Sequence, residues 1–192
     1  MRSSPRTTPT RARLGGTAAV LAGLCYGAAG YLDRPGISGY TGALVSVLSV
    51  ALPALFLGGP LGLQTRLPPA TRTDFASSVG VVGFVFGCFG AVLGAVGSLG
   101  LEGTAIKEWW WVLLSAGLTL MGLAALLKGG QRLLGAVVSI SGALGCVSLL
   151  TDPTFSSVLV PMRSVHGVFA AAFCLSAVAW GSVLVAPYSR GR

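Results

Sequence analysis

The chain has 192 residues, of which 53% are hydrophobic and only 9% are charged, with a mean hydropathy of +0.81. A soluble domain carries about 25% charged residues, so this composition excludes an ordinary soluble protein and predicts several membrane spans. The formal net charge of +8 comes from basic residues outside the apolar runs. This placement favours contact with anionic lipid headgroups over a nucleic-acid partner, for which the chain has no separate domain.

Six apolar runs, separated by loops with charged residues, proline or glycine, predict an all-α bundle of six transmembrane helices. We expect one membrane domain at residues 14–187, a disordered basic segment at 1–13 and a short tail at 188–192. The first run is longer than the apolar region of a usual signal peptide, which favours an uncleaved helix over a cleaved one. The expected spans are residues 14–32, 39–57, 76–101, 109–127, 133–150 and 165–186.

Three features predict local structure in or beside these spans. Pro53 lies inside the second span and is expected to kink it, because proline removes a backbone donor. Gly58, Gly59 and Pro60 are expected to end that span, since both residue types break helices. The three consecutive tryptophans at 109–111 open the fourth span and predict an aromatic belt at the membrane surface.

The third span has glycines at alternating steps of three and four residues, a sustained 3.5-residue period. On a helix these glycines form one narrow stripe without side chains. Glycine is a poor helix former in water, but in lipid such a stripe lets another helix come very close. We expect this span to be the central packing helix, with its stripe facing either the bundle or a partner. The stripe comprises Gly80, Gly83, Gly87, Gly90, Gly94 and Gly97.

The basic residues predict the orientation of the bundle. Six spans put both termini on one side, and only Arg34, Lys107 and Arg163 fall on the other. The positive-inside rule then places both termini in the cytoplasm. The strong preference for arginine over lysine is typical of a GC-rich bacterial genome, so we expect a bacterial cell membrane. The basic residues on the terminal side are Arg2, Arg6, Arg11, Arg13, Arg66, Arg72, Lys128, Arg132, Arg190 and Arg192.

A faint internal repeat is also present. Leu-Ser pairs recur at 48–49, 114–115 and 175–176, in each span that would run inward. A threefold duplication of a helical hairpin would explain these pairs, and so would chance, because the pair is common. Two inverted halves of three spans, as in many transporters, are a further alternative.

The cysteines do not indicate a metal site or a redox motif. Cys25, Cys88, Cys146 and Cys174 lie in four different apolar runs, with no CxxC spacing. We therefore expect reduced thiols that act as small apolar side chains, and neither a metal nor another cofactor.

No Asp, Glu, Lys or Arg lies within the six expected spans. Ion and proton pathways usually need such residues, so the sequence argues against an ion-coupled pump. The outer loops and helix ends instead supply candidate polar residues around the single histidine. They are His166, Arg163, Glu102 and Glu108.

A serine on the fourth span and a histidine on the sixth resemble the arrangement in rhomboid intramembrane proteases. The residues around Ser115 depart from the Gly-x-Ser-Gly context of that family, because they are Leu113-Leu114-Ser115-Ala116-Gly117. The second span also lacks the histidine and asparagine of that family. A Ser–His pair further needs an oxyanion hole, for which the sequence offers no candidate.

These observations favour a non-enzymatic membrane subunit, assembly partner or helix-packing scaffold. The alternative is a small permease or channel for a neutral or lipidic solute, and the third hypothesis is an intramembrane hydrolase. The expected partners are the lipid bilayer and either a second copy of the chain or another membrane protein, with no nucleic acid.

Overall fold

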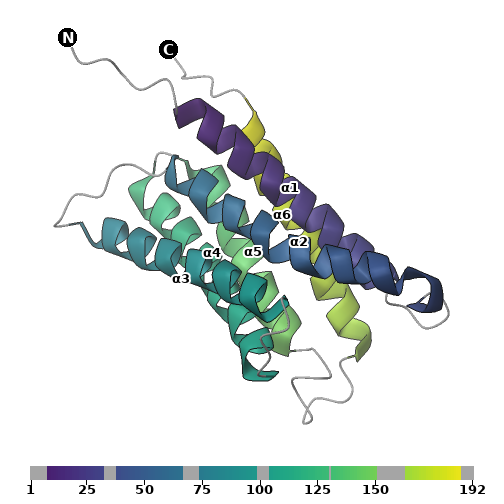
Figure 1. The fold of residues 1–192 in the computed structure, drawn as a ribbon. Helices are drawn as coiled ribbons and strands as arrows, with labels where there is room; N and C mark the ends of the chain where they lie inside the picture. Colours follow the sequence, from purple (N-terminus) through teal and green to yellow (C-terminus); the bar gives the residue numbers. More distant parts are fainter. Residues whose placement is uncertain are drawn as a thin grey trace.

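A computed structural model describes residues 8–32, 38–66, 74–98, 104–129, 131–150 and 163–186, which form helices and no strand (Figure 1). The predicted all-helical class is therefore confirmed for the described residues. Four helices, α3 to α6, are long and apolar enough to cross a membrane, which supports a multi-pass membrane protein. The helices are α1 (Thr8–Leu32), α2 (Ser38–Gln64), α3 (Phe75–Ser98), α4 (Thr104–Lys128), α5 (Arg132–Leu150) and α6 (Arg163–Val185).

Several helices extend beyond the spans expected from the sequence. Helix α1 begins at Thr8, which corrects the expectation of disorder up to residue 13. Pro9 is compatible with this start, because the first turn of a helix needs no donor from its backbone nitrogen. Helix α4 likewise begins at Thr104 rather than at residue 109.

Helix α2 continues through Gly58, Gly59 and Pro60 to Gln64, so the expected end at residue 57 is wrong. Membrane helices tolerate such breakers, because neighbouring helices and local adjustments compensate for the freed backbone groups. The helix ends instead in a tight turn, in which Thr65 Oγ1 donates to the carbonyl oxygen of Gly62 at 2.7 Å.

The six described helices form a closed ring with two layers of three. Helix α1 packs most extensively against α2 and α6, and α4 packs most extensively against α3 and α5. We call these groups the α6–α1–α2 layer and the α3–α4–α5 layer. The lesser contacts α2–α3 and α5–α6 join the layers, and Figure 1 shows α1 and α6 on one side with α3 and α4 on the other.

Glycines bring neighbouring backbones into direct contact inside each layer. A β-carbon at Gly83 would lie 2.8 Å from the Gly117 carbonyl oxygen, and one at Gly16 would lie 2.6 Å from that of Gly181. Such an approach gains dispersion contacts and weak Cα–H···O bonds, which matter in lipid because burial of apolar side chains gains little there. The approaches join Gly15 with Gly58 and Gly62 (α1–α2), Gly16 with Gly181 (α1–α6), Gly83 and Gly87 with Gly117 (α3–α4), and Gly122 with Gly135 (α4–α5).

We predict that Gly90→Ala lowers the midpoint of thermal unfolding in detergent. The new β-carbon would lie 2.7 Å from the Trp110 carbonyl oxygen, so two backbones must separate, which costs roughly 1–3 kcal/mol as overpacking. Gly167→Ala is the matched control, because Gly167 is also helical and has no atom within 4 Å of the new methyl group. Equal losses at both positions would mean that the contact between α3 and α4 contributes nothing specific.

Candidate functional site

A cluster of aromatic rings fills the centre of the ring of helices. The side chain of Trp111, from α4, is only 6% exposed. It stacks on Tyr26 of α1 with ring centroids 4.9 Å apart, and it contacts Phe173 of α6 at 4.9 Å and Phe56 of α2 at 5.9 Å. Phe173 also contacts the rings of both Tyr26 and Phe56. They form a socket on the α6–α1–α2 layer that receives a single side chain of the other layer.

The polar end of Trp111 is satisfied within its own layer. Its Nε1 donates a hydrogen bond of 3.0 Å to the carbonyl oxygen of Gly145 on α5. Ser115 stands one turn further along α4, is fully buried, and also lies directly against Gly145. Any side chain at position 145 would collide with Ser115, so this glycine lets α5 approach both residues.

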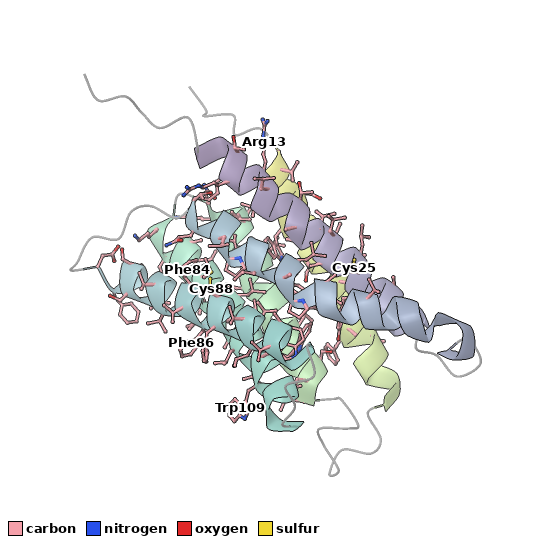
Figure 2. The ribbon with its side chains drawn as sticks, in the orientation of Figure 1. Arg13, Cys25, Phe84, Phe86, Cys88 and Trp109 are labelled. Carbon is pink, nitrogen blue, oxygen red and sulfur yellow. The ribbon has the colours of Figure 1, made fainter. Side chains whose placement is uncertain are left out.

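The buried Trp111 corrects the expectation of an aromatic belt at residues 109–111. Consecutive helical residues point about 100° apart, so the three rings face different surroundings. Trp109 is 59% exposed and points away from the bundle in Figure 2, Trp110 covers Gly94 of α3, and Trp111 is in the core. The belt interpretation is thus wrong for Trp111.

The glycine stripe of α3 lies at buried positions along its whole length. Gly83 and Gly90 face the backbone of α4. Gly87 lies between Gly117 of α4 and the Pro60 ring of α2, and Gly94 lies between the Trp110 ring of α4 and the Pro53 ring of α2. At these four positions the stripe faces other helices of this chain. The exposed side of the helix carries large apolar side chains instead, namely Val81, Val82, Val85, Phe86, Phe89 and Val92.

The remaining candidates from the sequence do not come together. The four cysteines are free, half-buried and spread over α1, α3, α5 and α6. Within the described part of the chain, no three His, Cys, Asp or Glu side chains are grouped as metal ligands would be. Glu102 lies outside the described residues, and so do the side chains of Glu108, Arg163 and His166.

The hydroxyl groups mostly bind the helix that carries them. Thr119 Oγ1 donates to the Ser115 carbonyl oxygen at 2.9 Å, and Ser182 Oγ donates to that of Val178 at 2.8 Å. An exception is the bond of 3.0 Å from Ser176 Oγ on α6 to Ser141 Oγ on α5. Ser115 Oγ itself has no hydrogen-bond partner in the described part of the chain. Among the described side chains, none is hydrogen-bonded to this hydroxyl as an activating base would be.

The charged groups gather at one end of the bundle. Asp74 caps α3, where its carboxylate accepts hydrogen bonds from Ala76 N and Ser77 Oγ, both at 3.1 Å. Lys128, at the end of α4, lies 3.5 Å from the same carboxylate. Desolvation raises the pKa of Asp74, but these hydrogen bonds and the charge of Lys128 outweigh it and hold the pKa below its usual value.

Arg66, which follows α2, joins this charged end to α6. Its guanidinium donates to the carbonyl oxygen of Leu184 at 3.2 Å, at the end of α6. A cation is favourable at this position, because the last carbonyl groups of a helix carry partial negative charge. The exposed Arg11, Arg13 and Arg132 lie at the same end, on helices that start there.

No protein-family model, no curated protein and no solved structure matches this chain.

We predict that Trp111→Ala destabilises the protein strongly, whereas Trp109→Ala has little effect. Truncating a buried tryptophan costs roughly 3–5 kcal/mol, because the contacts with its neighbours are lost and a cavity remains. Trp109 is the matched control, since it is two residues away and mostly exposed. Thermal unfolding in detergent measures both variants, and similar midpoints for the two would contradict the central role of Trp111.

We also predict that Asp74 makes the stability depend on acidic pH. A carboxylate with a lowered pKa stabilises the folded state above its ordinary pKa of about 4, and this contribution disappears as the pH falls through the lower folded value. Asp74→Asn should therefore lower the unfolding midpoint at pH 7 and lose that part of the pH dependence. Gln64→Ala, at the same end, is the control. An unchanged pH profile in Asp74→Asn would contradict the assignment.

Proposed function

We propose that this chain is a six-span protein of the cell membrane that acts, without catalysis, as a structural subunit or assembly partner. The filled interior is the observation that supports this proposal. Trp111 and its socket occupy the centre of the ring, where a solute path would otherwise run. The described core also contains no charged side chain to bind an ion or move a proton. Contacts with partners would then be made from the apolar outer surface.

The distribution of charge supports an orientation with both termini in the cytoplasm. Arg11, Arg13, Arg66, Lys128 and Arg132 belong to one end of the bundle, where Asp74 is the acidic residue among the described side chains. A basic end of this kind favours the cytoplasmic face, whose leaflet is rich in anionic lipids.

Impermeant thiol labelling tests this orientation. In a variant without the native cysteines, Thr104→Cys and Ser156→Cys should react in intact cells, and Pro5→Cys should react only after lysis. Labelling at position 5 in intact cells would overturn the orientation. So would the absence of labelling at positions 104 and 156 in intact cells, if both positions are labelled after lysis.

A second candidate function is a small permease for a neutral or lipidic solute. The observation that favours it is the division into two three-helix layers that meet through lesser contacts. Many transporters are built from two such halves, with their binding sites between the halves.

One pair of measurements decides between the two functions. For a subunit, native membranes extracted with a mild detergent should yield a complex of defined mass well above the 19.4 kDa of the chain. Purified protein in vesicles should then leave glycerol permeation and the flip-flop of a fluorescent phospholipid unchanged. A lone chain that accelerates either process, and loses this activity on heat denaturation, would contradict the subunit and establish the permease.

A further inference from the structure

The packing of the helices has an internal two-fold correspondence. If α1, α2 and α3 are matched with α4, α5 and α6, the pair α1–α2 corresponds to α4–α5 and the pair α3–α4 to α6–α1. These are the four most extensive pairs, and the two lesser pairs, α2–α3 and α5–α6, also correspond. A threefold repeat of hairpins would instead make α1–α2, α3–α4 and α5–α6 equivalent, although α5–α6 is among the lesser contacts.

The residues that make the matching contacts also correspond. Aligned along their lengths, α3 and α6 place Gly90 opposite Ala177 and Gly94 opposite Gly181. Gly90 and Gly94 contact α4, and the corresponding Ala177 and Gly181 contact α1. The helices are antiparallel in both the α3–α4 contact and the α6–α1 contact. In each, later residues of the first helix meet earlier residues of the second.

A half of three spans enters and leaves the membrane on opposite sides, so two such halves have inverted orientations. The two-fold operation exchanges the α6–α1–α2 layer with the α3–α4–α5 layer. The layers are therefore equivalent units, and the two seams between them, α2–α3 and α5–α6, are equivalent joints.

The seams are built differently from the interior of each layer. Inside the layers, glycines put backbone against backbone. At the seams, the proline rings of α2 lie on glycines of α3, and Phe173 and Ser176 of α6 meet α5 through side chains. The side chains of Phe173 and Ser176 at the α5–α6 seam can turn about their own bonds, and the proline rings at the α2–α3 seam meet glycines rather than interlocking side chains. In these contacts no backbone is pressed against another, as it is inside each layer.

We propose that the two layers are the moving parts of this protein and that Trp111 is the latch that holds them closed. Trp111 belongs to the α3–α4–α5 layer, where Gly145 fixes its N–H group, and its ring enters the socket of the opposite layer. Separation of the layers withdraws the ring from the socket and gives water access to Trp111 and to the buried Ser115. This device goes beyond either proposed function, since a subunit and a permease can both use such a joint.

A disulfide across one seam tests the proposal. Ser141→Cys with Ser176→Cys joins α5 to α6, where the native oxygen atoms lie 3.0 Å apart. The four native cysteines are first replaced by alanine. The measurement is hydrogen exchange of the Trp111 indole N–H in lipid nanodiscs, with its signal assigned by its loss in Trp111→Phe. We expect the oxidised seam to slow this exchange by roughly tenfold or more, and reduction to restore it.

The matched control is a disulfide inside one layer. Gly27→Cys lies within reach of the native Cys174, since its β-carbon would be 3.7 Å from that sulfur, and it joins α1 to α6. Here only the other three cysteines are replaced, and the exchange of the Trp111 N–H should stay unchanged. The indole of Trp180, buried within the α6–α1–α2 layer against Gly59, is an internal reference that neither disulfide should affect.

Four results would overturn the proposal. Equal slowing by both disulfides would mean that exchange follows global unfolding rather than separation of the layers. No slowing by the seam disulfide, or no measurable exchange in the unlinked protein, would mean that the layers do not separate there. Failure of the seam cysteines to join under oxidation, when the control pair joins, would contradict the α5–α6 contact itself.

Discussion

The insertion of Trp111 between Tyr26, Phe56 and Phe173 is the interaction on which the rest of the bundle depends. Burial of apolar surface drives little helix association in lipid, because lipid tails are as apolar as the side chains. Stability must then come from close packing, and a ring of six helices encloses a centre that lipid cannot fill. One indole in contact with three rings gains many small dispersion contacts that an empty centre would forfeit. The glycines bring neighbouring helices close enough for the Trp111 ring to reach the rings of the opposite layer.

Prolines and glycines act together at the junction of the two layers. Pro53 and Pro60 of α2 remove backbone donors, which would weaken an isolated helix. Their rings lie against Gly94 and Gly87 of α3, which have no side chains to obstruct them. The same stripe thus serves the backbone of α4 and the proline rings of α2. This double use accounts for a glycine period that continues over the whole helix rather than over one crossing point.

The sequence predicted the helical class and the approximate position of every helix, because long apolar runs in lipid have few alternatives to helix. It did not predict the helix ends, since Pro9 and Gly58–Pro60 break helices in general but are tolerated at these positions. The core cluster was also missed. Tyr26, Phe56, Trp111 and Phe173 lie on four helices without a common period, and only tertiary packing brings them together. A hint was available for Trp111, because three consecutive helical residues cannot share one surface.

A core without charged side chains restricts how this protein can change state. The buried residues that the structure describes include no charged side chain, so the proposed separation of the layers rests on the packing of the helices. Trp111 has its hydrogen-bond partner in its own layer and its contacts with Tyr26, Phe56 and Phe173 in the other. Withdrawal from the socket therefore costs ring contacts first, and the N–H group can then exchange because water competes for its bond to Gly145. The free energy that holds the layers together at this point therefore depends on how well the Trp111 ring packs against the rings of Tyr26, Phe56 and Phe173.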